Sequence, residues 1–198
     1  MTHYWPFTNN QMTDQIGTAN MTQGASTKFT SDRFNCPNSA LALNGGWARV
    51  PAGIYFSDPQ FTVSVWILPH QLGTWCRLFD FGNGWRTDNI CVTLAAGNPL
   101  QPSLFLYSPT EYAFISSQYL TYDQWQFFAI TFDGVNSIFY INGTQVAKKT
   151  DQAYSLPRIT RTNCYIGKPF DAAGYSYSFL DDLRFYKKAL TQQEIVNE

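Results

Sequence analysis

Most of the side chains that could bind a sugar lie in two short segments, residues 75–77 and 85–89. Flat aromatic rings stack on the apolar faces of sugars, while Asn, Asp and Arg hydrogen-bond the hydroxyl groups. Residues 85–89 read Trp-Arg-Thr-Asp-Asn and combine a ring, a cation and acceptors. The alternative is that such rings cap the hydrophobic core of the fold. The candidate ligand-binding residues, expected in loops rather than strands, are Trp75, Arg77, Trp85, Arg86, Asp88, Asn89, Tyr112 and Tyr175.

Carboxylates are too sparse to predict a glycosidase. Glycoside hydrolysis uses two carboxyl groups that flank the scissile bond. Glutamate occurs only at positions 111, 194 and 198, and no strand-like run carries two aspartates at i and i+2. We therefore expect no catalytic residue and no enzyme activity. The remaining enzymatic alternative is a glycoside hydrolase that uses an atypical pair, Asp80 and Asp88, which flank a loop.

The histidines and cysteines stand in no catalytic or zinc-binding motif. His3 and His70 accompany no Gly-x-Ser-x-Gly elbow, and the cysteines form no Cys-x-x-Cys pair. The cysteines are either buried thiols or up to two disulfides in one of three pairings. Their even number is typical of an oxidising compartment. They are Cys36, Cys76, Cys91 and Cys164.

Composition excludes several classes of protein. Of the 198 residues, 44% are hydrophobic and 14% are charged, which excludes a disordered chain and a charged coiled coil. The formal net charge of -1 leaves no Lys/Arg surplus, so nucleic acid is not expected as a partner. No apolar run is long enough to span a bilayer, and the first five residues lack the features of a secretory signal. We expect a single domain over residues 1–198 with no membrane insertion in this segment.

Short runs of alternating polarity predict β-strands. In residues 61–67, Phe61, Val63, Val65 and Ile67 share one face, which must be core, and the intervening residues share the other. Similar runs bounded by Gly, Pro, Asn or Asp predict further strands at 40–43, 47–50, 77–81, 90–94, 104–107, 112–116, 125–132, 138–141 and 163–167.

Turn and cap residues predict how these strands connect. Residues 133–137 (Asp-Gly-Val-Asn-Ser) and 142–143 (Asn-Gly) favour positive φ and predict two successive hairpins. Many short strands with frequent turns indicate an all-β, two-sheet antiparallel sandwich or jelly roll. At the C-terminus, Thr191 and Glu194 have capping-box spacing and predict one short helix.

The ordered set of motifs resembles the laminin G-like jelly-roll domains of the concanavalin A-like lectin/glucanase superfamily. The resemblance implies two stacked antiparallel sheets, with a first strand near Tyr4 beside a last strand near Phe185, and structural roles for Trp5, Trp66 and Trp125. It rests on residues 4–7 (Tyr-Trp-Pro-Phe), 14–17 (Asp-Gln-Ile-Gly), 32–34, 40–46, 61–67, 125–134, 139–144, 165–167 and 180–195.

The same resemblance implies a structural calcium ion where the loop after the first strand meets the last strand. Asp14 and either Asp181 or Asp182 occupy the matching positions. Strand alternation would turn Asp181 and Asp182 to opposite faces, so at most one of them would serve the ion. The alternative is that Asp182 binds backbone amides or an arginine and that Asp14 forms a turn. Calcium is the only cofactor expected.

Together these observations predict a non-catalytic extracellular recognition or adhesion module, secreted or in the ectodomain of a surface protein. Its leading ligand class is carbohydrate, and its expected partner is a glycan or an extracellular protein. The alternative is a protein-binding or spacer module of a larger surface protein. Fold alone does not decide between them, because the superfamily includes lectins, hydrolases and adhesion modules.

Overall fold

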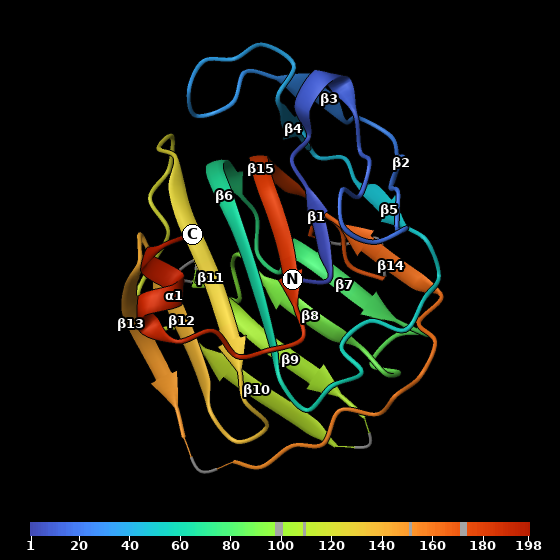
Figure 1. Ribbon diagram of the computed structural model, residues 1–198, viewed down its shortest axis with the longest axis vertical. Coiled ribbons are helices and arrows are strands. Elements are labelled where there is room, and N and C mark those ends of the chain that lie inside the picture. The colour runs from blue at the N-terminus through green and yellow to red at the C-terminus, as the bar shows by residue number, and fades with distance from the viewer. Residues whose placement is uncertain (98–100, 109, 151, 171–173) are drawn as a thin grey trace.

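Two antiparallel β-sheets stack face to face in the computed structural model of the chain (Figure 1). The structure describes residues 1–97, 101–108, 110–150, 152–170 and 174–198. The eight-stranded sheet has the order β13 (Thr144–Lys149), β12 (Ser137–Ile141), β11 (Gln126–Phe132), β6 (Phe61–Leu72), β15 (Ser176–Tyr186), β4 (Ala40–Ala42) and β3 (Lys28–Thr30), with β1 (His3–Trp5) paired to β15 beside β4.

The seven-stranded sheet positions the candidate site. Its order is β10 (Glu111–Ile115), β9 (Ser103–Tyr107), β8 (Ile90–Thr93), β7 (Arg77–Gly82), β14 (Asn163–Ile166), β5 (Ala48–Val50) and β2 (Thr22–Gln23). The remaining elements are a 3-10 turn at Thr8–Asn10 and the helix α1 (Gln192–Val196). The prediction of an all-β, two-sheet antiparallel sandwich with a short C-terminal helix is confirmed.

The core lies between the sheets, as the alternation in β6 predicted. Phe61, Val63, Val65 and Ile67 are fully buried and belong to one hydrophobic cluster that also contains Phe79 and Phe81 of β7, among others. This cluster includes residues from Trp5 near the N-terminus to Phe185 near the C-terminus. The two ends of the chain are joined because β1 pairs with β15, with His3 opposite Phe185, which confirms the expected neighbours.

A smaller cluster closes the outer face of the eight-stranded sheet. Ile195 of α1 packs there with Phe127 and Leu190, and α1 lies beside β11, β12 and β13 (Figure 1). The predicted capping box is present: Glu194 N donates to Thr191 Oγ1 at 3.3 Å, and Thr191 N donates to Glu194 Oε2 at 2.9 Å.

The two predicted hairpins join β11, β12 and β13. In the first turn, Asp133 Oδ1 accepts hydrogen bonds from the amides of Val135 at 2.9 Å and Asn136 at 2.6 Å. In the second, Asn142 and Gly143 have φ of 50° and 74°. β13 itself was not predicted, because its residues are exposed or half-buried and do not alternate in polarity.

Two further findings bear on the sequence-based expectations. All four cysteines are free thiols, with Cys36 exposed and the other three buried. Within the described residues, no helix has both the length and the apolar character that a membrane crossing requires.

Candidate functional site

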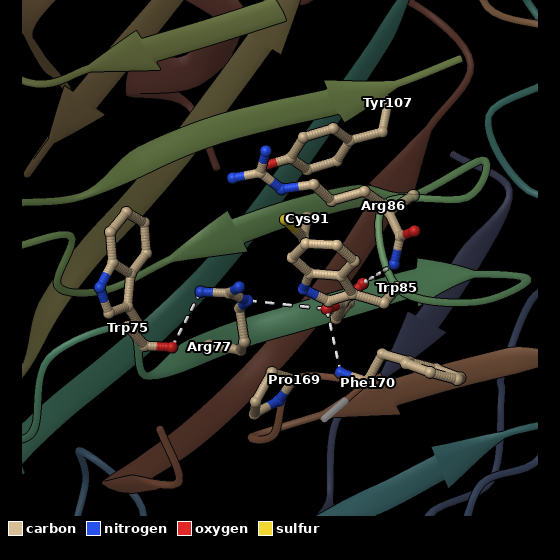
Figure 2. Close-up of a pocket in the computed structure, with 10 residues that line it drawn as sticks. Trp75, Arg77, Trp85, Arg86, Cys91, Tyr107, Pro169 and Phe170 are labelled. Atoms are coloured by element: carbon tan, nitrogen blue, oxygen red, sulfur yellow. Dashed lines mark hydrogen bonds and ion pairs between the residues drawn. The ribbon is translucent and has the colours of Figure 1, made fainter. Parts of the chain in front are cut away.

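A cavity of about 240 Å³ opens on the outer face of the seven-stranded sheet (Figure 2). This face points away from the main core, since Cys91 and Phe105 belong to a separate small cluster while Phe79 and Val92 face inward. The cavity is lined by Trp75, Arg77, Asp80, Trp85, Arg86, Asn89, Cys91, Tyr107, Pro169 and Phe170. Among the predicted ligand-binding residues, those that the fold brings together here are Trp75, Arg77, Trp85, Arg86 and Asn89.

A β-bulge in β7 turns Arg77 and Asp80 to the same side of the sheet. The β7–β8 register shifts between Arg77 and Phe79, and both Leu78 and Phe79 point into the core. As a result Arg77 Nε lies 3.7 Å from Asp80 Oδ2. Arg77 Nη1 also donates to the carbonyl of Trp75 at 2.8 Å, which links the guanidinium to the loop before β7.

Asp80 lies deep in the cavity and is surrounded by donors. The residue is 4% exposed, and its carboxylate accepts hydrogen bonds from Asn89 Nδ2 at 2.7 Å and from the Phe170 amide at 3.2 Å. Burial raises the pKa of Asp80, and the Asn89 hydrogen bond and the Arg77 charge oppose that rise. Both carboxylate oxygens are therefore engaged within the protein.

Among the described residues, Asn89 and Arg77 each have a buried polar atom that makes no hydrogen bond, although Arg77 Nε faces Asp80 Oδ2 in the ion pair at 3.7 Å. Asn89 is 4% exposed, and its Oδ1 accepts no hydrogen bond from any described residue. Arg77 Nε likewise has no hydrogen-bond acceptor within the described part of the chain. The lack of a side chain at Gly82 permits this arrangement, because a Cβ there would overlap the Asn89 amide. Buried polar atoms that make no hydrogen bond are costly, and these two belong to side chains that line the cavity.

Two exposed tryptophans stand at the rim of the cavity. Trp85 in the β7–β8 loop is 66% exposed, and Trp75 in the β6–β7 loop is 47% exposed. The Arg86 guanidinium lies 5.2 Å from the centroid of the Trp85 ring and 5.4 Å from that of Tyr107. Trp75 has φ of 63°, and Gly174 packs against its backbone so closely that a Cβ would clash. Exposed indoles held in this way offer flat apolar surfaces beside the buried polar groups.

A second, shallower hollow of about 220 Å³ adjoins the cavity and shares Arg86 and Tyr107 with it. Asp88 lies here, where it accepts hydrogen bonds from Asn83 Nδ2 at 3.0 Å and Ser108 Oγ at 2.9 Å. Arg86 pairs with Glu111 at 3.4 Å across the same hollow. Asp80 and Asp88 thus line different hollows, and each is already hydrogen-bonded to other side chains.

Two predicted ligand residues lie elsewhere. Tyr112 was expected in a loop but lies fully buried in β10, and its hydroxyl is 2.7 Å from Ser137 Oγ. The expectation of a surface role for Tyr112 is therefore wrong, because β10 turns this ring into the core. Tyr175 is half-buried just before β15 and does not line the cavity.

Several lining residues were missed from the sequence. Tyr107 ends a predicted strand on the outward face, and that alternation was the one available signal for it. Pro169 and Phe170 follow β14, far along the chain, and no local pattern links them to residues 75–91.

Asp14 is engaged in a way that does not fit a calcium ion. Its carboxylate accepts hydrogen bonds from the amides of Tyr4 at 3.0 Å, Gly17 at 3.0 Å and Ala19 at 3.1 Å, and lies 2.7 Å from His3 Nδ1. Burial acts to raise the pKa of Asp14, but these hydrogen bonds outweigh it and lower the pKa to about 2. A cation would have to displace amide donors, which carry partial positive charge.

Asp181 and Asp182 also bind positive partners. Arg33 pairs with Asp181 through Nη1 and with Asp182 through Nη2, the latter at 2.8 Å. Alternation predicted opposite faces for these two carboxylates, and that prediction is wrong, because a bulge in β15 with φ of 52° at Asp182 brings both to one guanidinium. Across the described residues, no three His, Cys, Asp or Glu side chains converge on a potential metal position.

Comparison with known proteins places the fold among known β-sandwiches. The chain has a TM-score of 0.82 and 22% identity to domain 4 of AbnA, a GH43 extracellular arabinanase from Geobacillus stearothermophilus solved in complex with arabinotriose, over 99% of this chain and 96% of that one.

Two toxin binding domains are also similar, although the chain spans only about half of each. The binding domain of Paraclostridial Mosquitocidal Protein 1 gives a TM-score of 0.72 at 19% identity, over 99% of this chain and 51% of that chain. The botulinum neurotoxin serotype G binding domain gives a TM-score of 0.72 at 16% identity, over 99% of this chain and 50% of that chain.

The comparison with curated proteins found no match. A family match does exist: Laminin_G_3, described as concanavalin A-like lectin/glucanases superfamily, matches residues 43–196. This range covers most of the chain and includes every residue that lines the cavity. Together with the two-sheet antiparallel sandwich, it shows that the chain belongs to the Laminin_G_3 family of the concanavalin A-like lectin/glucanase superfamily.

Proposed function

We propose that the protein is a non-catalytic carbohydrate-binding module and that the cavity between Trp75 and Trp85 is its binding site. One observation carries this proposal: two exposed indoles border a buried hydrogen-bonding set made of Arg77, Asp80 and Asn89. Figure 2 shows Trp75, Arg77 and Trp85 at the pocket, and Asp80 and Asn89 also line it.

The arrangement suits the two chemical properties of a sugar. The C–H groups of a pyranose or furanose ring form an apolar patch, and an indole can cover it at little entropic cost. The hydroxyl groups on the ring edge both donate and accept hydrogen bonds, so they suit a cavity lined by the polar side chains of Arg77, Asp80 and Asn89. The similarity to an arabinanase domain solved with arabinotriose supports the proposal.

We place the module outside the cell, as a recognition or adhesion part of a secreted or surface protein. The support is its likeness to a domain of an extracellular enzyme and to toxin binding domains. A glycan or an extracellular protein would then be its partner.

The direct test is a glycan array followed by titration calorimetry on the glycans retained. We expect Trp85→Ala to weaken binding by at least about tenfold, because stacking on one exposed indole is worth roughly 1.5 kcal/mol. The matched control is Phe34→Ala, which removes another exposed aromatic ring, one that packs on Arg33 at the other sheet. Phe34→Ala should leave the affinity unchanged.

Equal affinity in the wild type and Trp85→Ala would show that the ligand, if any, binds elsewhere. Retention of no glycan by the wild type would favour the protein-binding or spacer alternative. The hydrolase alternative has its own assay, since an enzyme would release reducing sugar and Asp80→Asn would abolish that release. We expect no release above the rate without protein.

A further inference from the structure

The cavity and the hollow next to it share a wall. Arg86 and Tyr107 line both of them, and the second hollow continues to the turn between β9 and β10. Pockets that bind small molecules generally measure about 300–1,000 Å³. At about 240 Å³ and 220 Å³, each hollow alone falls short of that range, and together they lie within it.

The contacts that form the shared wall lie at the surface. The Arg86 guanidinium contacts the rings of Trp85 and Tyr107, and it pairs with Glu111 at 3.4 Å. The side chains of Arg86 and Glu111 are 53% and 44% exposed, and an exposed ion pair of this kind contributes little to stability. A ligand can therefore replace the ion pair at little cost.

Buried side chains fix the backbone around the second hollow. Arg161 is fully buried and donates from Nε to the carbonyl of Asp88 at 2.8 Å. The Tyr154 hydroxyl lies 2.7 Å from the carbonyl oxygen of Ser108 and 2.8 Å from that of Thr110. The Ser108 hydroxyl donates to Asp88 at 2.9 Å, which ties the β7–β8 loop to the β9–β10 turn. The second hollow is thus held in place beside the cavity, and such preorganisation lowers the entropic cost of binding.

The opposite side of the cavity is bounded by the segment that follows β14. Pro169 and Phe170 line the cavity there, across from Tyr107 (Figure 2). Beyond them Lys168 covers Tyr165 of β14, with Nζ 4.3 Å from the centroid of the ring. A ligand that fills the cavity would therefore extend towards β9 and β10, where the second hollow lies.

We propose that the two hollows form one binding site for an oligosaccharide, with one sugar unit against Trp85 and a further unit beside Ser108 and Thr110. The inference rests on the proposed function and deepens it, because it names a chain of linked sugars, and not a single sugar, as the ligand class. Linked units gain contacts in both hollows, since the second unit binds at the high effective concentration that the linkage imposes.

The test measures affinity against chain length by titration calorimetry. The probes are the β-1,4-linked glucose and xylose series and the α-1,5-linked arabinose series, each from the monosaccharide to the tetrasaccharide. In a series that binds, we expect the trisaccharide to bind at least about tenfold more tightly than the monosaccharide, because the monosaccharide can occupy only one hollow.

Thr110→Trp tests the second hollow, because the added indole would fill the space that the further sugar unit needs. Thr110 is exposed, so the variant should fold, and it should weaken the trisaccharide by about fivefold or more while leaving the monosaccharide unchanged. Trp85→Ala should weaken both probes, since both need the cavity. Thr144→Trp is the matched control: it makes the same change at an exposed position of β13, in the other sheet, and should alter neither affinity.

The results that would count against the inference are distinguishable. A monosaccharide that binds as tightly as the trisaccharide would overturn it while leaving the carbohydrate-binding function in place. A length dependence that persists unchanged in Thr110→Trp would also overturn it, since the chain would then extend elsewhere. Absence of binding by every probe and on the glycan array would overturn the proposed function itself.

Discussion

At the residue scale, Asp14 holds the loop that follows β1 against β1 itself. Its side chain accepts hydrogen bonds from the amide of Tyr4 in β1 and from the amides of Ile16, Gly17 and Ala19 in the loop. We expect Asp14→Asn to lower the free energy of unfolding by on the order of 2 kcal/mol at neutral pH, because a carboxylate accepts these bonds better than an amide does. Urea unfolding of both proteins would measure the difference.

The pH dependence of this effect follows from the direction of the pKa shift. The pKa of Asp14 is lowered from 3.8 to about 2 in the folded protein, so the stabilisation is complete above about pH 4 and is lost as the pH falls towards 2. The wild type and Asp14→Asn should therefore converge in stability in acid. A difference that stays constant down to about pH 2 would contradict this account.

The sequence could predict those site residues that lie close together along the chain, but not those that strand pairing brings together. Trp85, Arg86 and Asn89 are neighbours in one loop, so their joint chemistry is visible without a structure. Phe170 reaches Asp80 only because β14 pairs with β7, a contact between residues far apart in sequence. Tyr112 was misassigned because a ring at the start of a strand gives no sign of which face it takes.

At the element scale, the long loop between β3 and β4 is held to β15 by one arginine. Arg33 stacks on Trp66 at 4.8 Å and pairs with both Asp181 and Asp182. Burial, together with the charge of Asp182, raises the pKa of Asp181 to about 7 despite the presence of Arg33. We expect Arg33→Ala to destabilise the protein by about 2 kcal/mol or more near pH 8, because the buried Asp181 carboxylate then lies beside Asp182 without its cation, while Asp182 keeps Arg184 at 3.4 Å.

The cost of Arg33→Ala should be smaller near pH 5. There Asp181 binds a proton, since its folded pKa is raised above the unfolded value and rises further without Arg33, so the repulsion between the carboxylates disappears. Denaturant unfolding at the two pH values measures this. The double variant Arg33→Ala/Asp181→Asn is the control and should lose most of the pH dependence. Equal costs at both pH values would show that the charges do not matter.

The elements that the sequence predicted well are those specified by nearby residues. The turns at 133–137 and 142–143 and the Thr191–Glu194 cap need only local chemistry, and the structure confirms them. The bulges at Arg77–Phe79 and at Asp181–Arg184 were missed, because each depends on the register with a neighbouring strand. The bulge in β7 creates the Arg77–Asp80 pair, so the most important geometry of the site was invisible to strand alternation.

At the scale of the whole molecule, the stability should not depend on a metal ion. The aspartates expected to bind calcium are occupied by amides at Asp14 and by Arg33 at Asp181 and Asp182. We expect EDTA and added calcium to leave the melting temperature unchanged, because an ion that binds only the folded state would raise it. A rise with calcium that EDTA reverses would show that an ion site exists.

The last prediction concerns how much of the chain the fold needs. The family match begins at residue 43, yet β1, β2, β3 and β4 lie before that residue and contribute to both sheets. β1 and β4 pair with the edge of β15 that β6 does not cover. Trp5 and Phe7 are fully buried in the main core, and losing each should cost roughly 3–5 kcal/mol, together comparable to the whole stability of a typical domain.

A fragment of residues 43–198 should therefore show no cooperative thermal transition by circular dichroism, whereas the full chain should melt in one step. Removing residues 192–198 is the matched control, because it deletes α1 but leaves every strand of both sheets. That shorter chain should still melt cooperatively, at a lower temperature, since Phe127 loses its contact with Ile195. Cooperative melting of 43–198 near the midpoint of the full chain would mean that the first strands are an addition to the sandwich. If the fragment instead unfolds, the N-terminal strands belong to the same folding unit as the cavity, because the sandwich then requires β2 in the sheet that holds the cavity and β1, β3 and β4 in the opposite sheet.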